Sequence, residues 1–235
     1  MQRLLVINPN TTAAVTQDLA AQVRLALGPG VDVQFTTARF GAPYIADEPS
    51  YAVATHATLD AWAEHTRLHP ETQGPHTGVL VGCFGDPGLL AVRACAAGPV
   101  TGLAAASLAE TAALTDDGPC AIVTGGHAWG PMLERICREL PHGERVQGIV
   151  TVDMTGGEMR AHPERAHQQL LQACHTARQR HPQAQALIVG GAALGGWAAR
   201  LQAQVDVPLV DSVQAGARQA ALAPQGHGQG RPAWI

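Results

Sequence analysis

Short apolar runs alternate with longer amphipathic segments along the whole chain. Between 12 and 27, apolar residues recur every four positions, which is the spacing of one helix face, and 163–179 shows a similar pattern. The short runs are rich in β-branched residues and predict strands at 3–7, 32–36, 78–82, 98–103, 120–124, 148–152, 185–190 and 207–210. Strands that alternate with helices are typical of βαβ units, so we predict an α/β fold with mostly parallel sheets flanked by helices.

The two halves of the chain repeat the same pattern. In the first half LLVINPN is followed by GVLVGCFGD, and in the second AIVTGGH is followed by ALIVGGAAL. We therefore predict two pseudo-symmetric lobes, 1–112 and 113–223, with a helix at 212–222 that could pack back onto the first lobe. The glycine-rich end, 224–235, is predicted to be a flexible tail. Because ligands bind at the carboxyl ends of strands in such sheets, we expect the active site in the cleft between the lobes.

Composition and charge narrow the choice of partners. The 235 residues carry a formal net charge of -4 and only 14% are charged, so nothing indicates the basic surface that nucleic acids require. No apolar run is long enough to span a membrane, and the first one, 4–7, is too short for the core of a signal peptide. Five cysteines form no CxxC pair, which favours a reducing compartment. We expect a cytoplasmic protein that binds neither nucleic acid nor membrane.

The segment VGCFGDPGLL combines a strand end, a thiol and a helix start. Asp86 is of a type that caps helices, and Pro87 is favoured at the first helical position. Cys83 would then face the positive end of that helix, where backbone N–H groups stabilise a thiolate. A cysteine at a tight turn can equally be a small buried apolar residue. The segment alone leaves these two interpretations open.

The first expected strand is followed by INPNTT, a second concentration of polar groups. Asn8, Asn10, Thr11 and Thr12 offer donors where a helix begins, and such a helix end can bind an anion. The same residues could merely cap the helix. The chain has no GxGxxG after this strand and no P-loop or GxSxG motif anywhere, which argues against nucleotide-binding and serine-hydrolase functions.

Two further features concern ligands. Tyr44 lies in GAPYI, where Gly41 and Pro43 predict a fixed turn that could present the phenol over the cleft. His65 and His69 have the i, i+4 spacing of a two-histidine metal site, but no third ligand accompanies them and a proline ends the helix there. We interpret the two histidines as a solvated helix end and expect no metal.

Six segments together resemble the hydantoin racemase branch of the aspartate/glutamate racemase superfamily. They are INPNTT at 7–12, GAPYI at 41–45, VGCFGDPGL at 81–89, PVTGL at 99–103, AIVTGG at 121–126 with Trp129, and VPLVDSV at 207–213. They cover almost the whole chain in the family's order. The resemblance implies a two-lobed α/β enzyme that needs no cofactor, acts on a small carboxylate or imide and assembles as a homo-oligomer.

In this family, two cysteines on opposite faces of the substrate remove and return a proton at an acidic carbon next to a carbonyl. The resemblance makes Cys83 the first of them. It also implies a shell that holds the substrate, formed by Asn8, Thr11, Thr12, Phe84, Gly85, Thr124 and Gly125.

The chain departs from the family at the second thiol. VGGAALGG places Gly191 where relatives have the other cysteine, so we expect the substrate's second face to be open there. His127, in VTGGHAWG, is the nearest alternative base by intrinsic pKa, although a capping or surface role fits it as well. Related arylmalonate decarboxylases protonate with a single cysteine, so decarboxylation is the alternative to racemisation. Binding of a small anion without catalysis is a third possibility.

Overall fold

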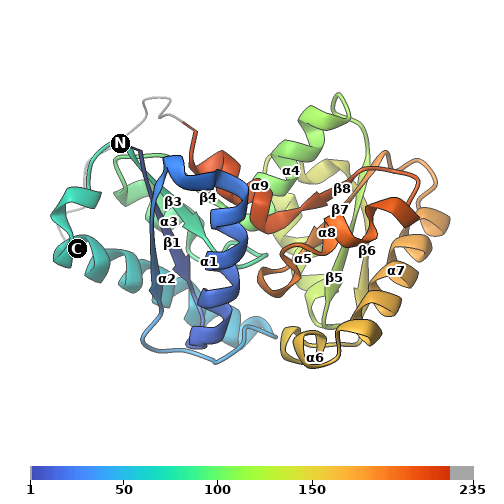
Figure 1. The fold of residues 1–235 in the computed structure, drawn as a ribbon, viewed down its shortest axis with the longest axis horizontal. Helices are drawn as coiled ribbons and strands as arrows, with labels where there is room; N and C mark the ends of the chain where they lie inside the picture. The colour runs from blue at the N-terminus through green and yellow to red at the C-terminus, as the bar shows by residue number, and fades with distance from the viewer. Residues whose placement is uncertain (1, 223–235) are drawn as a thin grey trace.

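The computed structural model describes residues 2–222, which form two parallel four-stranded sheets (Figure 1). The first sheet has the order β2-β1-β3-β4 and the second β6-β5-β7-β8. The strands are β1 (Arg3–Asn8), β2 (Asp32–Thr37), β3 (Thr77–Val81), β4 (Val100–Gly102), β5 (Cys120–Gly125), β6 (Val146–Val152), β7 (Ala186–Gly190) and β8 (Leu209–Asp211). Each expected strand is present, and the α/β fold class is confirmed. The predicted tail, 224–235, lies outside the described residues.

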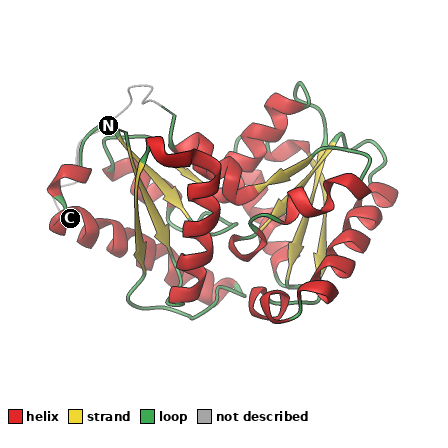
Figure 2. Cartoon of the chain, viewed as in Figure 1, coloured by secondary structure: helices red, strands yellow, loops and turns green. Residues whose placement is uncertain are grey.

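Helices cover both faces of each sheet (Figure 2). They are α1 (Ala13–Leu27), α2 (Glu48–Leu68), α3 (Leu89–Cys95), α4 (Leu103–Leu114), α5 (Trp129–Glu139), α6 (Gly156–Ala161), α7 (Pro163–Arg180), α8 (Trp197–Leu201) and α9 (Ser212–Ala220). The helices expected at 12–27 and 163–179 are confirmed as α1 and α7. Within residues 2–222, no helix is both long and apolar enough to cross a bilayer.

Strand residues alternate between two apolar layers. Leu4 and Val6 join an inner core that also contains residues of α1, α4, α5 and α9, while Leu5 and Ile7 pack with α2 and α3. The second sheet is built likewise, because Ile122 belongs to the same inner core and Val123 packs with α7 and α8. Sheets that are covered on both faces need apolar residues at consecutive positions, which explains the uninterrupted apolar runs in the sequence.

Two helices cross between the lobes. Helix α4 follows β4 of the first sheet but packs on β7 and β8 of the second, and α9 follows β8 but packs on α1, β3 and β4. The two helices also pack against each other along the middle of the molecule (Figure 1). The helix expected at 212–222 therefore packs on the first lobe. This exchange fixes the carboxyl ends of the two sheets relative to each other.

Candidate active site

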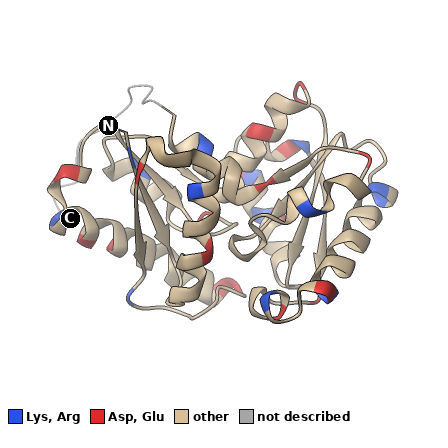
Figure 3. Cartoon of the chain, in the orientation of Figure 1, with Lys and Arg blue, Asp and Glu red and all other residues tan. Residues whose placement is uncertain are grey.

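A cavity of about 120 Å³ lies between the lobes at the carboxyl ends of the strands. The first lobe lines it with Asn10, Val15, Tyr44, Ile45 and residues 82–84. The second lobe lines it with Thr124, Gly125, Trp129, Gly156, Met159 and residues 190–194. None of these side chains carries a formal charge at neutral pH. Charged residues lie mostly on the outer helices and connecting loops (Figure 3).

Cys83 follows β3 by two residues and is buried, with 8% of its surface exposed. Its carbonyl accepts hydrogen bonds from the N–H groups of Gly85 (3.0 Å) and Asp86 (3.1 Å), which close a tight turn. The preceding Gly82 leaves no room for a side chain, because a Cβ there would lie 2.7 Å from a methyl of Leu19. The turn therefore fixes the thiol at the wall of the cavity.

The thiol of Cys83 is held in its protonated form. Burial raises the pKa of Cys83, and the negative charge of Asp86 raises it further. The expectation of a thiolate stabilised by the following helix was wrong. Helix α3 begins only at Leu89, six residues after Cys83, and it follows Gly88 in a left-handed conformation (φ 79°).

Asp86 also differs from its expected role. It does not cap the helix that follows it in sequence. Its carboxylate instead accepts hydrogen bonds from the N–H groups of Ala104 (2.9 Å) and Ala105 (2.7 Å) at the start of α4. Asp86 thus joins the turn that carries Cys83 to a helix that packs on the second sheet.

The loop after β1 uses most of its polar groups internally. Asn8 is fully buried and donates to Asn10 Oδ1 (3.0 Å), Thr12 O (3.1 Å) and Thr16 Oγ1 (3.0 Å). The hydroxyl of Thr12 donates to Pro43 O (2.6 Å), and the N–H of Thr11 donates to the carbonyl of residue 42. Asn8, Thr11 and Thr12 consequently hold the loop together and are not among the residues that line the cavity.

Asn10 is the residue of this loop that reaches the cavity. Its Oδ1 accepts hydrogen bonds from Asn8 Nδ2 (3.0 Å) and Thr12 N (2.9 Å). Its Nδ2 makes no hydrogen bond within residues 2–222 and remains available as a donor. The INPNTT motif pointed to this loop, but the sequence could not show which of its polar residues would face a ligand.

Two aromatic residues lie at the junction of the lobes. Tyr44 is 45% exposed and lines the cavity, and a Cβ at Gly157 of α6 would lie 3.6 Å from its hydroxyl. Trp129, at the start of α5, packs on Gly85, where a Cβ would lie 2.6 Å from the indole ring. Gly85 itself does not line the cavity. Its carbonyl accepts a hydrogen bond from Tyr51 (2.8 Å), so Gly85 helps to hold the Cys83 turn.

In the second lobe, β5 and β7 bring Thr124, Gly125 and Gly191 to the cavity. Gly191 has φ 151°, a conformation that favours glycine, and its N–H donates to Ser212 Oγ (3.1 Å). Phe84 of the first lobe occupies the space next to Gly190, where a Cβ would lie 2.3 Å from the ring. The wall at Gly191 thus offers backbone and apolar side chains, and Cys83 is the only cysteine that lines the described cavity.

His127 lies away from this cavity. Its Nδ1 is 3.2 Å from Thr151 Oγ1 and its Nε2 is 3.5 Å from Asp153, and the side chain is largely exposed. The expectation for His65 also needs correction, because His65 is buried and its Nε2 lies 2.9 Å from Gln34 Oε1. Only the more exposed His69 fits a solvated helix end.

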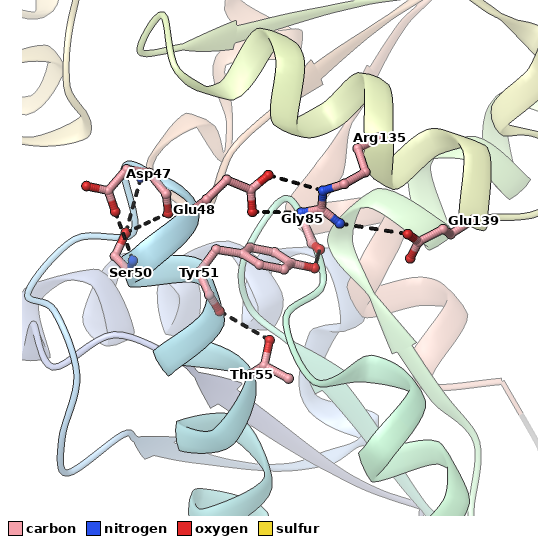
Figure 4. Close-up of polar contacts among 8 residues, drawn as sticks. All are labelled: Asp47, Glu48, Ser50, Tyr51, Thr55, Gly85, Arg135 and Glu139. Carbon is pink, nitrogen blue, oxygen red and sulfur yellow. Dashed lines mark hydrogen bonds and ion pairs between the residues drawn. The ribbon is translucent and has the colours of Figure 1, made fainter.

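An ion pair bridges one side of the cleft (Figure 4). Arg135 of α5 donates to both carboxylate oxygens of Glu48 of α2, at 3.1 and 3.0 Å. The guanidinium also lies 5.2 Å from the centre of the Tyr51 ring. Because Tyr51 donates to Gly85, this contact connects the second lobe to the Cys83 turn. Burial, followed by the charge of Asp86, raises the pKa of Tyr51 to about 12, so the phenol remains a donor.

Comparisons with known proteins identify the family and the fold of the chain. The model of the Asp/Glu/hydantoin racemase family matches residues 4–220. A hydantoin racemase from Paenarthrobacter aurescens is 28% identical over 93% of this chain and 89% of its own. An allantoin racemase from Klebsiella pneumoniae has 25% identity and a TM-score of 0.80 over 94% of this chain and 86% of its own.

A structure of arylmalonate decarboxylase shares the fold, with 17% identity and a TM-score of 0.63 over 99% of this chain and 96% of its own. The named racemases indicate an isomerase of the racemase type. The match over nearly the whole chain confirms the resemblance seen in the sequence, and this protein belongs to the Asp/Glu/hydantoin racemase family.

Proposed function

We propose that this protein is a cofactor-independent racemase of an uncharged cyclic imide, such as a substituted hydantoin or an allantoin-like ring, and that Cys83 exchanges the proton. The observation that carries the proposal is the cavity lining, in which a buried thiol faces a space without charged side chains. A substrate carboxylate would lose its hydration there without gaining a cationic partner. A ring imide is neutral, and its N–H and C=O groups can bond to Asn10, Thr124 and the backbone.

The proposed reaction is a proton transfer at the ring carbon next to a carbonyl. The thiolate form of Cys83 removes the proton, and the electron pair of the broken C–H bond delocalises onto the carbonyl oxygen. Donors at the cavity wall, among them Asn10 Nδ2, stabilise that oxygen. Return of the proton by the thiol on its own face regenerates the starting enantiomer. Protonation by water on the face of Gly191, which has no side chain, gives the opposite enantiomer, and the hydroxide that remains takes the proton from the Cys83 thiol and restores the thiolate.

Decarboxylation is the second candidate, and the burial of Cys83, which raises the pKa of its thiol, is the observation that favours it. A malonate would lose carbon dioxide next to Gly191, and the thiol would protonate the resulting enediolate. This route needs no prior removal of a proton by Cys83. The neutral cavity favours racemisation over it, because a malonate brings two carboxylates and the lining offers no cation to either.

Deuterium exchange in heavy water tests the proposal. Both enantiomers of a hydantoin with one substituent at the acidic carbon are incubated with the protein, and loss of the ring C–H signal is followed by NMR. Exchange from both is expected, faster for the enantiomer whose hydrogen faces Cys83. Carbon dioxide release from an arylmalonate without hydantoin exchange would favour decarboxylation. If the ligand stabilises the protein but neither reaction occurs, the protein binds the ligand without catalysis.

A further inference from the structure

Asp86 is a buried carboxylate three residues after Cys83, with 5% of its surface exposed. Its backbone has φ 53°, in the left-handed region that few residues other than glycine adopt. Aspartate is among the residues that tolerate this conformation best, although it still stores strain of about 1 kcal/mol. A charged group that is both strained and buried needs compensation from its contacts.

The contacts of Asp86 hold the Cys83 turn from two directions. Its backbone N–H donates to Cys83 O (3.1 Å), and its carboxylate accepts from Ala104 and Ala105 at the start of α4. Gly102 makes room for the carboxylate, because a Cβ there would lie 2.2 Å from Asp86 Cγ. The position of the thiol is thereby tied to α4, which packs on the second sheet.

Within residues 2–222, four titratable side chains surround the carboxylate of Asp86. The titratable groups that face it are Cys83 on its own turn, Arg93 of α3, Tyr51 of α2 and Cys137 of α5. Arg93 is the cation among them, and its guanidinium also donates to Val100 O at 3.3 and 3.1 Å. A thiolate at Cys83 would therefore form next to a carboxylate in a buried environment.

We propose that Asp86 is a positioning residue that fixes the Cys83 turn and, once ionised, adds its negative charge to the effect of burial in keeping the thiol protonated. The reaction of Cys83 as a base then begins only at alkaline pH. The inference concerns the thiol on which the proposed function rests, but alkylation measures the protonation of that thiol without any substrate. The two proposals can therefore fail separately.

The test is the pH dependence of iodoacetamide labelling of Cys83, followed by mass spectrometry of the peptide, in the full chain and in Asp86→Asn. Removing the charge should lower the labelling midpoint by about one pH unit or more, which is about tenfold more thiolate at a pH below both midpoints. Asp116→Asn is the matched control, because Asp116 is exposed and also left-handed (φ 49°). Its labelling profile should equal that of the unmodified protein.

A second variant, Asp86→Gly, keeps the test informative if Asp86→Asn does not fold. The amide introduced by Asp86→Asn would offer one acceptor oxygen to two N–H groups, whereas Asp86→Gly removes the charge and suits the left-handed backbone. The same fall of the midpoint is expected in the glycine variant. An unchanged or higher midpoint in either folded variant would overturn the proposal. So would a midpoint in the unmodified protein at or below about 8.5, the ordinary value for cysteine.

Discussion

The two lobes have the same strand order, but they carry different residues at the strand ends that face the cavity. In the first sheet β3 ends in Val81, followed by Gly82 and Cys83, and in the second sheet the same three positions are Val189, Gly190 and Gly191. β3 pairs with β1 and β4, and β7 pairs with β5 and β8, so the two strand ends occupy equivalent places. One end presents a thiol and the other presents backbone. A repeated scaffold can therefore carry an asymmetric site.

The asymmetry extends beyond the missing side chain. Gly82 packs on a side chain of its own lobe, Leu19, whereas Gly190 packs on Phe84 of the other lobe. Gly191 has a backbone conformation that an L-residue rarely adopts, and a Cβ there would lie 3.2 Å from Leu194. The second lobe therefore leaves space at Gly190 for the phenyl ring of Phe84 from the first lobe. Replacing one glycine by cysteine is consequently not a simple restoration of symmetry.

The largest effect is expected from Cys83→Ala, which removes the thiol from the more reactive face. Hydrogen exchange from a hydantoin should fall at least about 100-fold, because a positioned acid or base contributes that much or more. Cys174→Ala is the control, since Cys174 is buried among α7 residues on the outer face of the second sheet. The hydrogen exchange rates of both variants are measured by NMR. Equal exchange in Cys83→Ala and the unmodified protein would remove Cys83 from the mechanism.

Each lobe also buries one carboxylate at a helix start, Asp86 for α4 and Asp211 for α9. Burial raises the pKa of Asp86 from 3.8 to about 7. The hydrogen bonds from the N–H groups of residues 105, 104 and 85 and the positive charge of Arg93 lower this pKa, but their effect is smaller than that of burial. Because the folded-state pKa is above the unfolded one, the stability contributed by this group is full below about pH 4 and is lost as pH rises through 7. The loss should be on the order of 2–4 kcal/mol.

Urea unfolding between pH 4 and 8 measures this loss when the unmodified protein is compared with Asp86→Asn. The variant should lack the part of the pH dependence that belongs to Asp86, while the histidines contribute equally to both proteins. Asp211→Asn provides the comparison with the second lobe, where burial also raises the pKa of the carboxyl. The same pH slope in the unmodified protein and in Asp86→Asn would contradict the prediction.

Gly191→Cys sharpens the comparison of the two faces. The left-handed backbone and the contact with Leu194 should cost about 1–3 kcal/mol of unfolding free energy. In the folded variant, a thiol on each face should bring the exchange rates of the two enantiomers closer together. Gly191→Ala is the matched control, because it has the same strain and no thiol. If both variants changed the ratio of rates equally, the effect would be steric and not chemical.

The sequence predicted the fold and part of the site for identifiable reasons. Apolar runs located the strands because both sheets are covered on both faces. The rule that ligands lie at strand ends pointed to the loop of Cys83, and the family resemblance added Thr124 and Gly191; all three line the cavity. Tyr44 was found from the turn residues before it. These signals are local, so a single sequence carries them.

The remaining site residues depend on contacts that are distant in sequence. Asp86 meets its partners 18 and 19 residues later, and no local pattern predicts that they lie together. Met159 reaches the cavity through α6, which follows a strand by several residues and has no catalytic signature. In the INPNTT loop the residue types were right, but only three-dimensional hydrogen bonding separates Asn10 from Asn8 and Thr12.

The smallest effect is expected from the ion pair between Glu48 and Arg135, which joins α2 of the first lobe to α5 of the second. A further pair within residues 2–222 connects Asp18 of α1 to Arg160 of α6. The Glu48 and Arg135 side chains are 55% and 38% exposed, so a double-mutant cycle with Glu48→Gln and Arg135→Gln should give a coupling of about 0.5–1 kcal/mol.

The pair of Glu64 and Arg67, within α2, serves as the control that does not cross the cleft. Urea unfolding at low and high salt measures both couplings, and both should weaken as salt screens the charges. Only the pair between the lobes should also change the labelling rate of Cys83, because Arg135 contacts Tyr51, which holds Gly85. A labelling rate that responds equally to both pairs would mean that the two lobes do not communicate through this contact.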